Sequence, residues 1–432
     1  MAEKNTLQNN IPFRDDNNQT RILSLIRDSD GMTRAGIAEA AALSILTTKK
    51  YVRELIDEGV IIESGTEEST GGRKAGILKI NPGHKYTLAA DIGAHSVKIG
   101  IVRLDGSIME NEYITAQEGQ IPARIISVDE LRKKLKALMQ KHDTDKFIGL
   151  GIGVSGLADH AGGIIRFCPN ISGWNNINVK NEFQDFLGIP AYVDTSARCT
   201  ALAEQHFGAG KSIGNQVYVS IGYSISTGII INSHLFRGAA GASGELGHVT
   251  AITGGSLCTC GNYGCLENYV TLPIIIWNIR KALTNYRGYS PLAELMALKG
   301  KLKAGAKDEA KTASGDDPLK SSKSFELEDV RYALEKGDKI VLNELSKAGD
   351  LLGTVLANMV NILNPELIIL GGGVVENFPI IVDEVERSIR KQSLIVTYQN
   401  LSVKKSALGY GGAISGSALQ VINLFFGQDP GC

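Results

Sequence analysis

Residues 258–267 read CTCGNYGCLE and contain three of the six cysteines of the chain. In a reducing cytoplasm, thiols spaced this closely are more typical of a metal site than of a disulfide framework. Zinc takes four tetrahedral ligands, and His248, ten residues before the first of these cysteines, is the fourth donor. The sequence therefore predicts one structural Zn²⁺ per chain, with the ligands His248, Cys258, Cys260 and Cys265. The alternative is a loop of unliganded thiols.

Length and composition set the broad class of the protein. The chain has 432 residues, of which 43% are hydrophobic and 21% charged, and its formal net charge is −1. This length predicts two or three domains. No apolar run approaches the roughly 20 residues of a membrane-spanning helix, and the first residues, MAEKNTLQNNIPFRDD, are too polar for a signal peptide. We therefore expect a cytoplasmic protein without a membrane segment.

Residues 20–59 have the pattern of three short helices. Apolar residues from Ile22 to Ile26 form a helical stripe that ends at Asp30 and Gly31. Thr33 and Ser44 are good N-caps for the second and third helices, and Gly59 is suited to end the third. Two short apolar strands follow around a glycine-rich tip at residues 71–74. This order is typical of a winged helix-turn-helix.

The positions of the cations indicate that this segment binds DNA. Threonines, lysines and an arginine lie on the polar side of the third helix, where they would reach base edges and phosphates. The predicted DNA-binding residues are Ser44, Thr47, Thr48, Lys49, Lys50, Arg53 and, in the wing, Gly71, Gly72, Arg73 and Lys74. The alternative is a small protein-interaction module.

After Pro82 the sequence contains an internal repeat. Residues 85–110 have the order strand, turn, strand, turn, strand, and residues 216–238 repeat it. The repeat predicts two similar α/β lobes with a ligand-binding cleft between them. Glycine-rich turns at residues 91–93 and 371–373 are either phosphate-binding loops or tight turns between strands.

Four longer motifs resemble the ROK family, which contains bacterial repressors and sugar kinases of the actin-like ATPase superfamily. They are GGRKAGILKINP (71–82), PNISGW (169–174), GAAGASGELGHVTAITGGSLCTCGNYGCLENYV (238–270) and ILNPELIILGGGVV (362–375). The resemblance implies an N-terminal winged helix-turn-helix (1–82) and a two-lobed actin-like ATPase domain with duplicated βββαβα lobes. The expected lobes are residues 86–198 with 410–432, and residues 199–409. Within the family, the winged helix distinguishes the transcription factors, of the xylose-repressor type, from the kinases.

The resemblance also implies a sugar pocket. Family members hold sugar hydroxyls with the Glu and His of an E-x-G-H motif and with the glutamate after the cysteines, and carboxylates and imidazole suit a polyol. The ligand-binding residues implied in this chain are Asn170, Thr195, Ser196, Glu245, His248 and Glu267.

The kinase machinery departs from the family pattern at two places. The kinases carry Asn-Asp-Ala-Asn, whose aspartate is the general base, whereas this chain has Thr195 and Ser196 at the first two positions. The kinase phosphate loop, Asp-x-Gly-Gly-Thr-Lys, becomes Asp91-Ile-Gly-Ala-His-Ser96. A serine hydroxyl is not a base near neutral pH, and Asp194 is two residues too early to replace it. We therefore expect a site that binds a sugar without phosphorylating it.

These observations predict a sugar-responsive transcriptional regulator, most often a repressor in this family. It would act as a homodimer or tetramer on a palindromic operator. The alternatives are an ATP-dependent sugar kinase with an N-terminal regulatory domain, and a non-enzymatic protein whose degenerate cleft binds a protein partner. The residues leave open the effector, the operator sequence and any surviving nucleotide binding.

Overall fold

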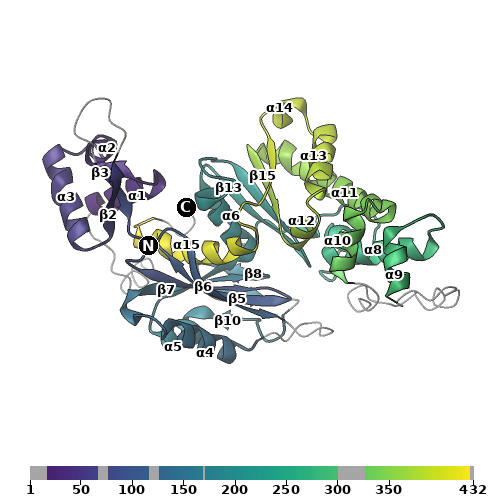
Figure 1. Ribbon diagram of the computed structural model, residues 1–432, viewed down its shortest axis with the longest axis horizontal. Helices are drawn as coiled ribbons and strands as arrows, with labels where there is room; N and C mark the ends of the chain where they lie inside the picture. Colours follow the sequence, from purple (N-terminus) through teal and green to yellow (C-terminus); the bar gives the residue numbers. More distant parts are fainter. Residues whose placement is uncertain (1–16, 67–75, 116–125, 169–170, 300–325, 429–432) are drawn as a thin grey trace. The chain divides into compact units, whose positions relative to one another are not determined.

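The computed structural model describes residues 17–66, 76–115, 126–168, 171–299 and 326–428 (Figure 1). The chain divides into two compact units. Unit 1 comprises the described residues up to 115, residues 126–207 and the C-terminal residues from 411, and unit 2 comprises residues 208–410. Among the described residues, no helix is long and apolar enough to cross a membrane.

The first part of unit 1 is the predicted winged helix-turn-helix. Its elements are α1 (Asn17–Asp28), β1 (Met32–Thr33), α2 (Arg34–Ala40), α3 (Ile45–Asp57), β2 (Ile61–Thr66) and β3 (Gly76–Ile80), and the strands form an antiparallel sheet in the order β1-β3-β2. Both predicted N-caps are present, because the Thr33 hydroxyl accepts from the Gly36 N–H and the Ser44 hydroxyl from the Thr47 N–H. Gly59, just after α3, has a φ of +78°, which fits its predicted role at the helix end. The wing tip, residues 67–75, lies outside the described residues.

The remainder of unit 1 is built on a five-stranded sheet in the order β11-β7-β4-β5-β6. The strands are β4 (Tyr86–Ile92), β5 (Ser96–Arg103), β6 (Ile108–Thr115), β7 (Phe147–Val154) and β11 (Ala191–Thr195). Strands β4, β5 and β6 form an antiparallel meander, and β7 and β11 add parallel strands beside β4. Helices α4 (Val128–Met139), α5 (Asp185–Leu187) and α6 (Ser196–Phe207) and a small sheet of β8 (Leu157–Asp159), β9 (Ile164–Phe167) and β10 (Ile177–Asn178) complete it.

Unit 2 repeats this plan, with the sheet order β14-β13-β12-β15-β16. Its strands are β12 (Gln216–Ile221), β13 (Ile225–Ile231), β14 (His234–Phe236), β15 (Leu367–Gly371) and β16 (Ser402–Lys405). Its helices are α7 (Glu267–Val270), α8 (Leu272–Asn285), α9 (Pro291–Leu298), α10 (Leu327–Glu335), α11 (Lys339–Leu363), α12 (Gly373–Asn377), α13 (Ile381–Gln392) and α14 (Ile395–Tyr398). In both sheets the first three strands are antiparallel and two parallel strands follow, so the predicted duplication is confirmed.

The last helix, α15 (Gly412–Phe425), belongs to unit 1 although it follows the last strand of unit 2. It packs on β7, β4 and α6 (Figure 1). Two glycines permit this close packing: a Cβ on Gly151 would lie 1.8 Å from the Ser417 carbonyl oxygen, and a Cβ on Gly416 would lie 1.8 Å from the Cys199 carbonyl oxygen. Backbone therefore contacts backbone where α15 crosses the sheet and α6.

Candidate functional site

Helix α3 presents a polar face that suits a DNA surface. Its core side is formed by the buried Val52 and Leu55, and the Lys49, Lys50 and Arg53 side chains are exposed on the other side. Exposed pairs join Lys50 to Glu54 (4.0 Å) and Arg53 to Asp57 (3.8 Å). Surface pairs of this kind are worth about 0–1 kcal/mol, so both cations can exchange these partners for phosphates.

One predicted DNA contact on this helix is wrong. Thr48 is fully buried, and its hydroxyl donates to the Ser44 carbonyl oxygen over 3.1 Å. The residue lies four positions before Val52 and seven before Leu55, so it shares their inward stripe. The predicted wing residues Gly71, Gly72, Arg73 and Lys74 lie outside the described residues.

Unit 2 brings the four predicted metal ligands together. One ligand atom from each of His248, Cys258, Cys260 and Cys265 lies within 4.8 Å of all the others. The Cys260 and Cys265 sulfurs are 3.6 Å apart, and the Cys258 sulfur lies 3.7 Å from His248 Nδ1. Tetrahedral zinc with ordinary bond lengths would separate two sulfurs by about 3.8 Å and a sulfur from a nitrogen by about 3.6 Å. The group can hold a metal ion.

Close backbone packing holds the cysteine loop in this shape. Gly264 has a φ of +75°, and a Cβ there would lie 1.8 Å from the Ile252 carbonyl oxygen. The thiols influence one another: burial, followed by the neighbouring thiols, raises the pKa of Cys265 to about 12. The Asn262 backbone N–H lowers the pKa of the exposed Cys260. Thiolates this close repel one another, so the donor set fits a cation.

The E-x-G-H motif lies beside the metal ligands on a short 3₁₀ turn at Leu246–His248. Gly244 and Gly247 let this turn approach β13: their Cβ atoms would lie 2.4 Å from the Thr227 carbonyl oxygen and 2.8 Å from that of Ile225. Glu267 begins α7, and its carboxylate accepts from the Ile225 N–H over 3.2 Å. Burial raises the pKa of Glu267. The predicted sugar ligands Glu245, His248 and Glu267 thus share one corner of unit 2.

Two other predicted ligands lie in unit 1, where β11 ends and α6 begins. Thr195 is the last residue of β11, and Ser196 is the first of α6. The Ser196 hydroxyl donates to Asp91 Oδ1 over 2.5 Å, and Lys98 Nζ lies 3.6 Å from Asp91 Oδ2. The Ser196 hydroxyl is therefore already bonded to a carboxylate. Asn170, also predicted as a ligand, lies outside the described residues.

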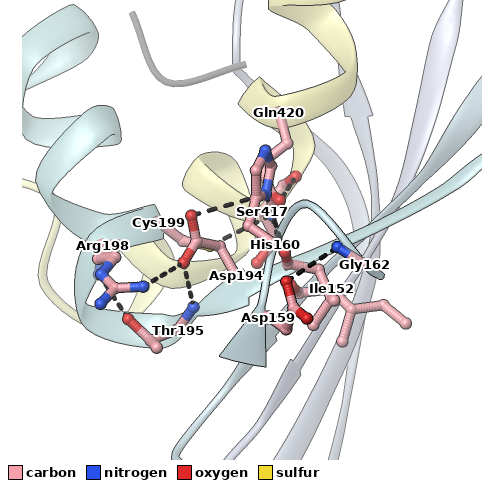
Figure 2. Close-up of polar contacts among 11 residues, drawn as sticks. Ile152, Asp159, His160, Gly162, Asp194, Thr195, Arg198, Cys199, Ser417 and Gln420 are labelled. Atoms are coloured by element: carbon pink, nitrogen blue, oxygen red, sulfur yellow. Dashed lines mark hydrogen bonds and ion pairs between the residues drawn. The ribbon is translucent and has the colours of Figure 1, made fainter. Parts of the chain in front are cut away.

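A buried ion pair fixes this junction, and sequence analysis did not identify it (Figure 2). Asp194 Oδ1 accepts from Arg198 Nη1 over 3.1 Å and from the Thr195 N–H over 2.8 Å. Both side chains of the pair are 1% exposed. His160, from the turn after β8, lies with Nδ1 3.7 Å from Asp194 Oδ2. Asp194 is thus held inside this cluster by the Arg198 guanidinium and the Thr195 N–H. The only available signal was the i, i+4 spacing of opposite charges.

A long-range contact was also missed, because its partners are about 400 residues apart. On α1, Arg27 Nη1 donates to Asn423 Oδ1 over 3.0 Å, and Nη2 donates to the Gln428 side-chain oxygen. The guanidinium lies 4.9 Å from the centre of the Phe426 ring, and the Arg27 side chain is only 8% exposed. The Ser24 hydroxyl donates to the Phe426 carbonyl oxygen over 3.4 Å. The winged helix is thereby bonded to the C-terminal end of α15.

A winged helix with exposed cations on its third helix, followed by a duplicated α/β body of the kinase type, defines a DNA-binding transcriptional regulator. Comparisons with known proteins agree. Residues 15–62 match a winged helix-turn-helix DNA-binding model, and residues 87–423 match the ROK family model. The chain belongs to the ROK family.

Two related proteins and one solved structure align with nearly the whole chain. A xylose repressor of Caldicellulosiruptor bescii is 28% identical over 409 residues, which is 94% of this chain and 95% of that protein. The DNA-binding transcriptional dual regulator NagC of Escherichia coli strain K12 is 26% identical over 93% of this chain and 91% of its own length. The solved structure of a ROK family transcriptional regulator, homologous to the E. coli MLC protein, has a TM-score of 0.73 and 26% identity and covers 95% of this chain and 96% of its own.

Proposed function

We propose that this chain is a sugar-responsive repressor. It binds operator DNA through the winged helix, and a sugar or sugar derivative through its kinase-like body, without phosphorylating that sugar. The observation that carries the proposal concerns Ser196, which by the family resemblance stands where the kinases have their catalytic aspartate. Its hydroxyl donates to Asp91. Loss of a positioned base removes about 10²- to 10⁴-fold in rate. Because the chain also has a winged helix-turn-helix, sugar binding at this site can regulate DNA binding.

The effector-binding residues with the strongest support are Glu245, His248 and Glu267. Glu245 and Glu267 are half-buried, and carboxylates are suited to accept hydrogen bonds from sugar hydroxyls. His248 presents Nδ1 to Cys258, so Nε2 lies on the other side of the ring, where it can contact a sugar. Asn170, Thr195 and Ser196 stay predictions from the family resemblance.

The coupling to DNA runs, in this proposal, through α6, α15 and α1. Ser196 begins α6, α6 contacts α15 backbone to backbone at Gly416, and α15 ends at the residues that bond Arg27. A sugar that binds one placement of α6 better than another therefore shifts the placement of α1. It does so only by as much as its affinities for the two states differ.

The test uses the purified full chain and a duplex selected from a random DNA library by that chain. Fluorescence anisotropy gives the DNA affinity with and without D-xylose, N-acetylglucosamine and glucose, and thermal shift reports sugar binding. We expect one sugar to raise the melting temperature and to weaken DNA binding at least fivefold, within the usual range of allosteric coupling. Glu267→Gln should lose the sugar response and keep DNA binding. If no sugar alters DNA affinity, the repressor proposal fails. Sugar-dependent ADP release from ATP would favour the kinase instead.

We propose that the metal is zinc, held by His248, Cys258, Cys260 and Cys265. Zinc would supply structure and no chemistry, by fixing the loop that carries the E-x-G-H motif and Glu267. Elemental analysis should give one zinc per chain, and Cys260→Ser should lose most of it. Cys432→Ser is the matched control and should keep it. Absence of zinc from protein purified without chelators would contradict the assignment.

We further propose that the chain acts as a homodimer, with residues 1–82 as the DNA-reading part. Two copies related by a two-fold axis match a palindromic operator. Light scattering of the complex with the selected duplex should give two chains, or four, per DNA. One chain per duplex would rule out this assembly.

A further inference from the structure

The first turn of α3 exposes two large apolar side chains. Ile45 is 62% exposed and Leu46 is 80% exposed, and they follow directly on the N-cap Ser44. The inward side of the same helix is already filled by Thr48, Val52 and Leu55. Burial in the winged helix therefore does not explain this pair.

Leu46 lies on the face that carries the cations, and Ile45, seven positions before the buried Val52, lies at the edge of that face. Leu46 precedes Lys49, Lys50 and Arg53 by three, four and seven positions, so these four side chains form one stripe along α3. At 1.5 Å per residue, the stripe is about 10 Å long, which is the length of about three base pairs. A recognition helix places its N-terminal residues against base edges in the major groove, and its cations reach phosphates.

The polar groups of the first turn are occupied within the helix. The Ser44 and Thr47 hydroxyls lie 2.8 Å apart in a hydrogen bond with each other, and the Ser44 hydroxyl also accepts from the Thr47 N–H. The outward surface of this turn is therefore mainly aliphatic. The apolar group that DNA offers in the major groove is the thymine C5-methyl.

We propose that Ile45 and Leu46 are specificity-determining residues that read thymine methyl groups in the operator. Each half-site then carries thymines within the roughly three base pairs under this stripe. The inference rests on the proposed function, because it requires that α3 enters the major groove. A protein partner for the same aliphatic pair is the competing explanation, and the experiment separates the two.

The experiment replaces thymine by deoxyuridine, which removes the methyl group and leaves the pairing and hydrogen-bonding groups unchanged. The full chain first selects a duplex from a random library. Anisotropy then compares the selected duplex with versions carrying deoxyuridine in the half-sites, for the wild type and for Leu46→Ala and Ile45→Ala. The wild type should bind about fourfold more weakly for each methyl that is lost from beneath the pair. Leu46→Ala should bind the thymine duplex correspondingly more weakly and should show little or no discrimination.

Lys50→Ala is the control, since loss of a phosphate contact weakens binding to both duplexes equally and reduces the salt dependence. Circular dichroism melting checks that the exposed-site variants stay folded. Equal wild-type affinity for thymine and uracil duplexes, or a selected half-site without thymine, would overturn the inference while leaving DNA binding intact. An altered oligomeric state of Leu46→Ala with an unchanged thymine-to-uracil ratio would assign the pair to a protein contact. If the chain selects no duplex at all, the proposed function itself fails.

Discussion

Replacement of Arg27 by methionine tests whether α15 transmits sugar binding to the winged helix. Methionine keeps an unbranched side chain against Phe426 but removes the donors to Asn423 and Gln428. Each hydrogen bond from a charged group is worth about 1.5–3 kcal/mol. With the Arg27 side chain 8% exposed, solvent screens these bonds little. Loss of two such bonds should weaken the contact between α1 and the end of α15 by about 3 kcal/mol or more. The equilibrium constant for forming this contact then falls about a hundredfold.

We expect Arg27→Met to uncouple sugar binding from DNA binding. Arg27→Met should still bind the effector sugar in a thermal shift assay and should still bind DNA, but the sugar should no longer change DNA affinity. Hydrogen exchange should accelerate in α1 and around residues 423–428. Arg21→Met is the matched control, because Arg21 lies on the same helix and is exposed. If Arg27→Met keeps the full sugar response and wild-type exchange in α1, the route through α15 is wrong.

Four further predictions test individual features. Thr48→Val should leave DNA affinity unchanged in the anisotropy titration, since the side chain is buried; a twofold loss or more would mean that Thr48 contacts DNA. Ser44→Ala should lower stability by about 1 kcal/mol through loss of the N-cap, seen as a lower urea midpoint, and an unchanged midpoint would contradict this. Gly264→Ala should lose bound metal in elemental analysis, because its Cβ would lie 1.8 Å from the Ile252 carbonyl oxygen; full metal content would refute the geometry. Burial raises the pKa of Cys168 to about 12, so at pH 8 this thiol should resist a disulfide reagent until the chain is unfolded, and rapid labelling of Cys168 itself in the native protein, located by peptide mass spectrometry, would argue against that burial.

Local patterns were enough to predict the fold. The helix-turn-helix depends on caps at Thr33 and Ser44 and on apolar stripes that lie within a few residues of one another. The duplicated sheets follow from a repeated strand order, and the metal cluster from ligands that lie within eighteen residues. Such features are visible because the residues that interact are close in sequence.

The features that sequence analysis missed do not lie within one regular helix or strand. Nothing in the local pattern around Arg27 indicates a partner at Asn423, and the Asp194–Arg198 pair crosses from a strand into a helix. The error at Thr48 is different, because the stripe that it shares with Val52 and Leu55 was present in the sequence. There the residue type, a threonine among cations, was given more weight than its helical position.

The packing of α15 explains why a change at Ser196 would not be absorbed before it reaches α1. At Gly416 the helix meets the Cys199 carbonyl of α6 with no side chain between them, and at Gly151 the sheet meets α15 in the same way. Side chains can change rotamer to absorb a displacement, whereas backbone contacts between regular elements move together. A shift of α6 therefore requires a shift of α15 along β7, and the end of α15 bonds Arg27. On this reasoning Gly416→Ala should separate α6 from α15 and abolish the sugar response, even though residue 416 contacts neither sugar nor DNA in the proposal. A variant that folds, binds both and still responds fully would show that coupling takes another path.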